Sequence, residues 1–317
     1  MAKALMKWRN LDIYLATLPT LKNNVFVSGV EPALHSRLKF LLSFHYYRKI
    51  DLEKAFPHPR PRLMADSGAF SAYSLGASID IHEYAAWIKR WKHLFDSYAN
   101  LDVIGSAQET LDNQHRLEDM GLHPLPVFHV GEPWEYLERY LEKYNYIALG
   151  GMAAYSISRK RKLIPWIIKA FKMLGVGQGY HGFGTTGWVI MKSFPWWSVD
   201  SSSWSSVVAY GHGHVFSITK GLFQFAICNV RSCFNVRHDL TRLGFHWEDF
   251  AKPTDDPLFG QHSVVRQKLL TLGAKSFIEA EMWLSRRHAN GSIKHIDPLS
   301  AGSGAYQKLL QVGGADG

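Results

Sequence analysis

Cysteine is scarce in this sequence, which holds only Cys228 and Cys233 among 317 residues. Two cysteines cannot supply the disulfide framework of a small secreted domain, so a reducing compartment is the simpler expectation. The cysteines stand near His238, His212 and His214, but these spacings match no standard zinc site. Buried or inert thiols are therefore favoured over a metal site at Cys228, Cys233 and His238, and no cofactor is expected.

Long hydrophobic runs are missing as well. No run reaches the roughly 18 apolar residues that a membrane-spanning helix needs, and residues 1–9 lack the apolar stretch of a signal peptide. We therefore expect a soluble cytoplasmic protein that has no membrane partner.

Acidic side chains are in deficit: 27 Asp and Glu stand against 36 Lys and Arg, which gives a net charge of +9. This excess favours a polyanionic partner such as nucleic acid, although scattered solvated charge is the ordinary alternative. Apolar residues make up 46% of the chain, enough for a sizeable core, which argues against disorder.

Short apolar runs alternate with longer helical patterns as far as residue 200, which is typical of repeated βα units around a parallel sheet. Strands are expected near 25–29, 41–46, 62–66, 99–104, 125–129, 145–149, 179–183 and 196–200. Eight parallel strands close a TIM-type (β/α)8 barrel. We expect residues 1–204 to form this α/β barrel as the catalytic domain.

Helical periodicity marks the segments between the strands. Apolar residues recur every three or four positions over 81–94, and similar patterns predict helices over 109–120, over 133–144 and from the basic run 158–162 onward.

The pattern changes after residue 204. Residues 211–214 are expected to form a loop, 264–272 and 277–287 to form helices, and the Gly- and Ser-rich tail after Asp297 to fray. Residues 205–317 are therefore predicted to be a mainly helical extension that contacts nucleic acid.

Residues that are suited to catalysis or ligand binding lie at or just after the predicted strands. They are Asp66 and Phe70, Asp102, His129, Gly150 and Gly151, Gly184, and Asp200. Because the carboxyl ends of parallel strands share one rim, we expect these residues to meet in one crevice. Each has an ordinary alternative: Asp-Ser-Gly steps cap helices, a strand histidine is often a core residue, and paired glycines form tight turns.

Taken in order, these segments resemble the queuine/archaeosine tRNA-guanine transglycosylase superfamily, and most closely its phage branch, the DNA 7-deazaguanine transglycosylases. The similar segments, over roughly residues 60–204, are Asp66-Ser67-Gly68-Ala69-Phe70, Leu101-Asp102-Val103, Val127-Phe128-His129-Val130-Gly131, Leu149-Gly150-Gly151-Met152-Ala153, His181-Gly182-Phe183-Gly184-Thr185 and Ser198-Val199-Asp200. The cysteine-rich zinc module of the tRNA enzymes is missing, which favours the DNA-acting branch.

The resemblance implies exchange of guanine in DNA for a 7-deazaguanine base, with no metal or redox cofactor. It implies Asp200 as the nucleophile at the anomeric carbon and Asp66 as the general acid/base, with a covalent Asp-deoxyribosyl intermediate. A gapless register would put the nucleophile at Ser203. We prefer Asp200 because a carboxylate is the better glycosyl acceptor.

The resemblance also implies a pocket for the base. Asp102 is expected to accept the donors of a guanine-like edge, while the backbone N–H groups of Gly150 and Gly151 approach its carbonyl. His129 stands where the family has a glutamine and is expected to contact the same edge. The other expected substrate-binding residues are Ser67, Gly68, Gly184 and Phe70, with Tyr73 as an alternative to Phe70 for stacking.

In a phage, such a modification would protect DNA from restriction, because an altered major-groove edge defeats direct readout. Three alternatives remain: the same exchange on tRNA, a barrel glycoside hydrolase, and a nucleic-acid-binding barrel without catalysis.

Overall fold

A parallel sheet of eight strands forms the centre of the molecule. The computed structural model describes residues 10–17, 29–152, 160–252 and 263–289. The strands are β1 (Asp12–Thr17), β2 (Lys39–Ser43), β3 (Arg62–Asp66), β4 (Phe95–Tyr98), β5 (Val127–His129), β6 (Tyr146–Gly150), β7 (Gly179–Gly182) and β8 (Ser198–Ser201). Their order in the sheet is β4-β3-β2-β1-β8-β7-β6-β5, and each neighbouring pair is parallel.

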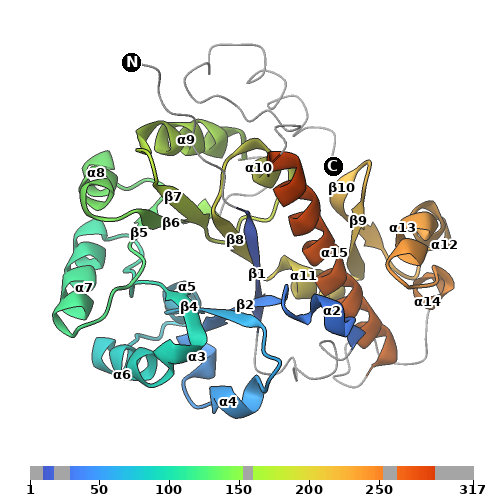
Figure 1. Ribbon diagram of the computed structural model, residues 1–317, viewed down its shortest axis with the longest axis horizontal. Helices are drawn as coiled ribbons and strands as arrows, with labels where there is room; N and C mark the ends of the chain where they lie inside the picture. The colour runs from blue at the N-terminus through green and yellow to red at the C-terminus, as the bar shows by residue number, and fades with distance from the viewer. Residues whose placement is uncertain (1–9, 18–28, 153–159, 253–262, 290–317) are drawn as a thin grey trace.

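The sheet curls until its two edge strands approach each other (Figure 1). A parallel bridge joins Ala99, just after β4, to Leu125, just before β5. The N–H of Leu125 donates to the carbonyl of Tyr98 at 2.8 Å, and the N–H of Asn100 donates to the carbonyl of Leu125 at 2.9 Å. The result is an α/β architecture consistent with a TIM-like fold.

Helices cover the outside of this sheet (Figure 1). They are α2 (Pro32–His35), α3 (Phe44–Tyr47), α4 (Leu52–Ala55), α5 (Ala69–Ser74), α6 (Ile81–Trp91), α7 (Ala107–Asp119), α8 (Trp134–Lys143), α9 (Lys160–Met173), α10 (Trp188–Ser193) and α11 (Ser203–Ser206), with 3-10 turns at Lys92–Leu94 and Val207–Tyr210. In α6, Asp80 caps the first turn by accepting from the N–H groups of His82 and Glu83. Its buried face includes Tyr84 and Trp87.

Alternate strand residues feed two separate hydrophobic cores. Residues such as Leu63 and Val199 belong to the large core between the sheet and the helices. Met64 and Val127 belong to a smaller core, which the opposite parity places inside the curled sheet. Because Asp66 is two residues beyond Met64, it shares this inward orientation.

Charged residues close the amino-terminal ends of the strands. Arg62 contacts Asp12 at 2.9 Å and Asp96 at 2.7 Å. The buried Lys39 lies 2.7 Å from the carboxylate of Glu281, which also accepts the N–H of Ile13 at 2.8 Å. These contacts stabilise the end of the sheet opposite the predicted catalytic rim.

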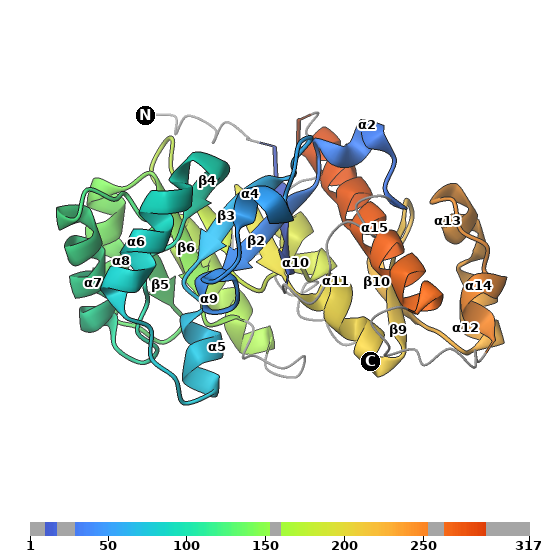
Figure 2. The ribbon, with the colours of Figure 1, turned by 90° about the horizontal axis from the view of Figure 1, so that it is seen from below.

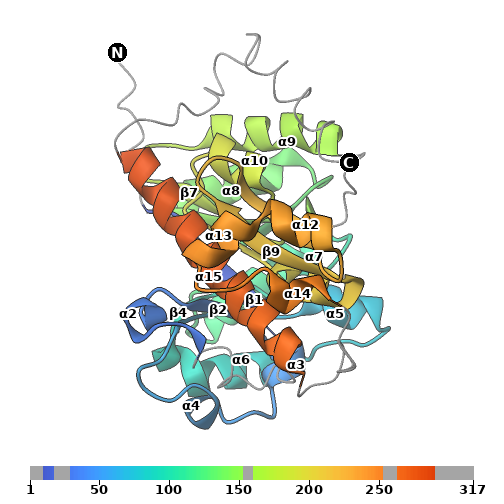
Figure 3. The ribbon, with the colours of Figure 1, turned by 90° about the vertical axis from the view of Figure 1, so that its right-hand side faces the viewer.

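Among the residues described after 210, the chain adds a hairpin and four helices. The elements are β9 (His212–Ser217), β10 (Gly221–Ala226), α12 (Val230–Asn235), α13 (Arg237–Arg242), α14 (Glu248–Ala251) and α15 (Val264–Ala289). Strands β9 and β10 pair antiparallel. Helix α15 contacts both β9 and β1, and Figures 2 and 3 show it between the hairpin and the sheet. It also carries Glu281, so this helix is packed into the same structure as β1 and β2.

The strand predicted at 62–66 is confirmed, and the strands predicted near 125–129, 145–149, 179–183 and 196–200 are found with small shifts in their ends. The helices predicted over 81–94, 109–120 and 133–144 are also confirmed with small shifts.

Several other predictions were wrong. Strand β1 at 12–17 was not predicted, whereas the strand predicted near 25–29 falls almost entirely on residues outside the described part. The strand predicted at 99–104 lies at 95–98, and the one predicted at 41–46 ends at Ser43, where α3 begins.

In the C-terminal part, 212–214 belong to a strand rather than a loop, and one helix replaces the two predicted over 264–287. Residues 158–159, at the predicted start of α9, and the tail after Asp297 lie outside the described residues. Within the described ranges, no helix has both the length and the apolar character needed to cross a membrane.

Candidate functional site

A cavity of about 860 Å³ opens at the carboxyl ends of the strands. Nine of the ten predicted site residues line it: Asp66, Gly68, Phe70, Asp102, His129, Gly150, Gly151, Gly184 and Asp200. The tenth, Ser67, is fully buried beside it, and its hydroxyl donates to Oδ1 of Asp102 at 3.1 Å. The topology therefore brings together residues that are up to 134 positions apart, from 66 to 200.

Asp66 ends β3, and the chain turns sharply after it. Gly68 has φ +77°, and a Cβ there would lie 2.1 Å from the hydroxyl of Ser43, so the turn requires glycine. The N–H of Gly68 donates to Oδ2 of Asp66 at 3.0 Å. Burial, followed by the nearby charges of Asp102 and Asp200, raises the pKa of Asp66 to about 8. Asp66 is therefore mostly protonated at neutral pH.

A histidine stands between two carboxylates on the neighbouring wall. Nε2 of His129 lies 2.9 Å from Oδ2 of Asp102, and Nδ1 lies 3.1 Å from Oε1 of Glu132. Burial on its own would lower the pKa of His129, but the hydrogen bonds and charges of Asp102 and Glu132 outweigh it and raise the pKa to about 10. The ring is therefore an imidazolium that donates from both nitrogens.

These contacts fix the orientation of Asp102. One of its carboxylate oxygens accepts from Ser67 and the other from His129. Each oxygen keeps acceptor capacity for a ligand, because a carboxylate has about four lone-pair sites. Both ring nitrogens of His129 face carboxylates, so its direct contact with a base edge stays a prediction.

Glycine at position 150 makes room for the histidine ring. A Cβ at Gly150 would lie 2.6 Å from Cδ2 of His129, so the ring packs directly across the backbone. Gly151 has φ +79° and turns the chain out of β6. The paired glycines therefore serve both the turn and the close approach of His129.

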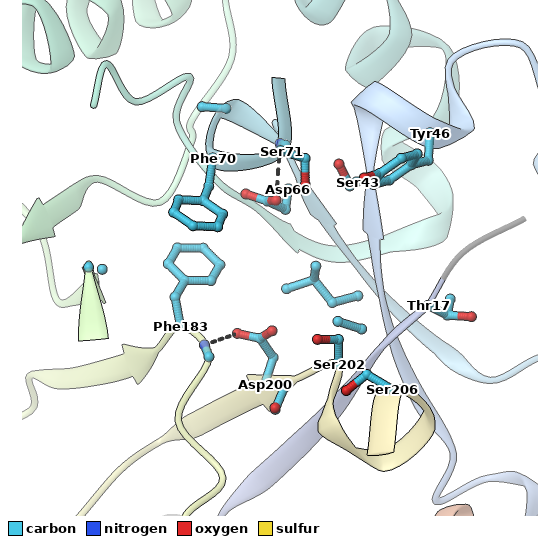
Figure 4. A pocket seen from close by; sticks show the side chains of 18 of the residues that line it. Thr17, Ser43, Tyr46, Asp66, Phe70, Ser71, Phe183, Asp200, Ser202 and Ser206 are labelled. Carbon is cyan, nitrogen blue, oxygen red and sulfur yellow. Dashed lines mark hydrogen bonds between the residues drawn. The ribbon is translucent and has the colours of Figure 1, made fainter. Parts of the chain in front are cut away.

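Asp200 enters the cavity from β8 on the other side. Its Oδ1 lies 3.2 Å from Nε2 of the buried His181 and accepts the N–H of Gly184 at 3.1 Å (Figure 4). Nδ1 of His181 is in turn 2.5 Å from the hydroxyl of Ser198. One carboxylate oxygen of Asp200 is thus held by two partners.

The alternative nucleophile has a different setting. The hydroxyl of Ser203 lies 3.3 Å from that of Thr186. Within the described chain, Ser203 is not among the residues that line the cavity, whereas Asp200 is. The geometry therefore favours Asp200 over Ser203 as the group that meets a ligand.

Several polar residues of the site were not predicted from the sequence. His181 and Glu132 contact predicted site residues, and Ser43 lines the cavity. The buried hydroxyl of Ser43 has no hydrogen-bond partner among the described residues. A signal existed for His181, because it alternates with the core residue Tyr180 and therefore points inward.

Aromatic rings border the cavity. Phe70 is 59% exposed although it is aromatic, and it lines the cavity together with Phe183. Figure 4 shows both rings at the border of the cavity. Tyr73, the alternative for stacking, is exposed on α5 but is not among the lining residues of the described chain.

The cysteines lie in the C-terminal part, away from the cavity lining. Cys228 is exposed and Cys233 is buried, and their thiols contact the carbonyl groups of Lys252 and Ala226. His238 is exposed on α13. Among the residues that the structure describes, no three His, Cys, Asp or Glu side chains are grouped so that they could hold a metal ion.

The two aspartates of the cavity therefore differ in their surroundings. Asp66 is mostly protonated, whereas one oxygen of Asp200 is held by His181 and Gly184. The chain matches no protein-family model and no curated protein sequence.

Proposed function

We propose that this protein is a (β/α)8-barrel transglycosylase that replaces guanine in DNA by a 7-deazaguanine base. The observation that carries the proposal is the meeting of Asp66 and Asp200 in one cavity in different electrostatic settings. Exchange of a base on a sugar needs one group to bond the anomeric carbon and another to handle the proton of the base. The two aspartates fit these two roles.

In the first half of the reaction, Asp200 attacks C1′ of the target deoxyribose. Its Oδ1 is held by His181 and Gly184, so Oδ2 is the oxygen that forms the ester bond. The C1′–N9 bond breaks as the proton on Asp66 passes to the departing guanine. The product is a covalent deoxyribosyl ester on Asp200 and an ionised Asp66.

The second half reverses these steps with the new base. N9 of the 7-deazaguanine gives its proton to Asp66 and attacks C1′, which breaks the ester and frees Asp200. Two displacements at the same carbon retain the configuration of the sugar. Asp66 ends protonated, as it began, so protons balance over the cycle.

Recognition of the base falls to Asp102 and the aromatic rings. A carboxylate fixed by Ser67 and His129 suits the amino and ring N–H donors of a guanine-like edge. The rings of Phe70 and Phe183 both line the cavity and offer flat apolar surfaces on which a base can stack (Figure 4). In a duplex, the target nucleotide must be flipped out of the stack to reach the cavity.

The net charge of +9 favours a nucleic acid as the substrate polymer, and the missing cysteine-rich zinc module of the tRNA enzymes favours DNA over tRNA. In a phage, the product would be DNA resistant to restriction enzymes of the host cytoplasm.

The proposal is tested by incubating the protein with duplex DNA that carries labelled guanine, with and without a 7-deazaguanine base, and in parallel with labelled tRNA. The expected result is release of label from DNA that requires the added base. Release from tRNA alone would refute the DNA assignment. Release that needs no acceptor base would favour a hydrolase, and no release from either polymer would favour a binding protein without catalysis.

A further inference from the structure

One wall of the cavity differs in chemistry from the rest. Ser202, Ser205 and Ser206 line it from the region of α11, and Arg266 lines it from the first turn of α15. We call these four residues the serine wall. Figure 4 shows Ser202 and Ser206 on the side of Asp200, across the cavity from the Phe70 ring.

Close packing between α11 and α15 holds the serine wall together. A Cβ at Gly273 of α15 would lie 2.8 Å from the carbonyl oxygen of Trp204 in α11, so the two backbones nearly touch. At the start of α15, the hydroxyl of Ser263, which is 1% exposed, accepts the N–H of Arg266 at 3.2 Å. The serines and the arginine are therefore presented by two helices in fixed contact.

The charge distribution restricts what this wall can bind. Among the described residues that line the cavity, Arg266 is the only arginine or lysine. The carboxylate of Asp102 lines another wall and disfavours an anion there. Hydroxyl donors beside a guanidinium are suited to phosphate oxygens, which accept several hydrogen bonds at once.

The position of the wall indicates which phosphate would lie there. The serine wall adjoins Asp200, the residue proposed to attack C1′ of the target sugar. In a DNA strand this sugar carries a phosphodiester on each side, so one of the two reaches the wall when C1′ is at Asp200.

We propose that the serine wall binds a phosphodiester that flanks the target deoxyguanosine, with Arg266 as its charged partner. This inference rests on the proposed function for the identity of the polymer. It assigns part of the substrate site to α15, beyond the segments that resemble the transglycosylases.

Binding of a short DNA strand tests the proposal. The probe is a fluorescent single-stranded pentanucleotide with one central deoxyguanosine, in three forms: unmodified, and with a neutral methylphosphonate on the 5′ or the 3′ side of that nucleotide. Dissociation constants are measured by anisotropy for the full chain, for Arg266→Gln and for Arg286→Gln. Arg286 is the matched control, because it is exposed on the same helix.

We expect Arg266→Gln to weaken binding of the unmodified probe about tenfold, and one of the two methylphosphonates to weaken wild-type binding by a similar factor. That methylphosphonate should cause a clearly smaller loss in Arg266→Gln than in wild type, because the charged partner of the phosphate is already gone. Arg286→Gln should bind within about twofold of wild type. The double variant Ser202→Ala/Ser206→Ala gives a second measurement that leaves the arginine in place. It should also bind the unmodified probe more weakly, and the methylphosphonate at the same linkage should then cost less affinity than in wild type.

Equal losses for both linkages in wild type and in Arg266→Gln would overturn the inference, as would absence of probe binding by wild type. Anisotropy requires no base exchange, so the two proposals fail separately. If the methylphosphonate effect depends on Arg266 but no base exchange is found, only the transglycosylase proposal is refuted. If base exchange is found but the methylphosphonate effect does not depend on Arg266, only the phosphate site is refuted.

Discussion

Nε2 of His129 lies 2.9 Å from Oδ2 of Asp102, and Glu132 holds the other nitrogen of the same ring. The three side chains form a line of alternating charge, and its end at Asp102 faces the cavity. Glu132 does not line the cavity in the described structure, so it acts on a ligand only through the histidine.

Glu132→Gln should therefore lower the pKa of His129 from about 10. Because the pKa of His129 is raised in the folded state, its stabilising effect is complete below the ordinary value of 6.5 and is lost as pH rises through about 10. The variant should thus be most destabilised near pH 6 and least near pH 11. Nitrogen NMR titration of the ring and denaturation at the two pH values measure these effects.

In the exchange assay, Glu132→Gln should raise KM for the incoming base by about tenfold with a smaller change in kcat, because Asp102 loses its fixed orientation. Glu135→Gln, an exposed change three residues later, is the matched control. An unchanged pKa of His129 in Glu132→Gln would contradict the pairing of His129 with both Glu132 and Asp102.

Asp200→Asn should reduce base exchange by about a thousandfold or more, because an amide cannot form the glycosyl ester. Ser203→Ala should stay within about threefold of wild type, because the serine contacts Thr186 rather than the cavity. Mass spectrometry of a denatured protein–DNA adduct gives the direct readout. An adduct on Ser203, or one that persists in Asp200→Asn, would reverse the assignment.

Asp66 should impose an upper pH limit on activity. Its pKa of about 8 belongs to the free protein, so kcat/KM should fall as pH rises through that value. Above that pH, Asp66 has lost the proton that it gives to the departing guanine. Asp66→Asn should remove most of the activity and this limb of the profile. A wild-type profile that stays flat up to pH 10 would argue against Asp66 as the acid.

The same carboxyl should make the protein less stable in alkali. Its pKa rises from 3.8 in the unfolded chain to about 8 in the fold, so its contribution is favourable below pH 4 and is lost as pH rises toward 8. Asp66→Asn should therefore be more stable than wild type at pH 9, by at least about 1 kcal/mol, and nearly equal to it at pH 4. Denaturant titrations at both pH values test this, with the exposed Asp119→Asn as control.

Glu281→Gln should destabilise the fold by about 2–4 kcal/mol, because it replaces the nearer carboxylate partner of the buried Lys39 by a neutral amide and leaves the more distant Asp12, at 3.3 Å, to balance the charge. Glu279→Gln, on the same helix, breaks a more exposed pair with Arg242 and should cost less than about 1 kcal/mol. Thermal or denaturant unfolding compares the two. Equal effects would mean that the buried pair has no special weight.

Strand β3 and the position of Asp66 could be predicted because local sequence decides them. An apolar run leads into a glycine whose left-handed backbone the turn requires, and both features can be read over a few residues. The inward faces of β5 and β8 follow similarly from alternation, which is why His129 and Asp200 meet the cavity as expected.

Strands β1 and β4 could not be predicted because their polar residues are compensated from elsewhere. Asp12 begins β1 and Asp96 lies in β4, and both are neutralised by Arg62 of β3. Viewed alone, the β4 segment Phe95-Asp96-Ser97-Tyr98 looks too polar for a strand of the barrel, and only the folded sheet brings Arg62 to it.

Two glycines misled the prediction of the C-terminal part. Gly213 lies inside β9, where a Cβ would come within 2.8 Å of Phe225. Gly273 lies inside α15, where a Cβ would lie 2.8 Å from the carbonyl oxygen of Trp204. Glycine normally signals a loop or a helix end, but here it permits close packing. The sequence does not distinguish these uses, because the partner is distant along the chain.

The pairing of Lys39 with Glu281 also bears on how the chain is completed during synthesis. The two residues are 242 positions apart, so the second strand leaves the ribosome long before its counter-ion has been translated. Until α15 emerges, a nascent sheet would hold the ammonium of Lys39 beside Asp12, 3.3 Å away in the fold, but without its nearer carboxylate partner Glu281, which makes premature closure of the sheet unfavourable. Folding of the sheet would then be completed only after α15 has been translated, and not already after β8.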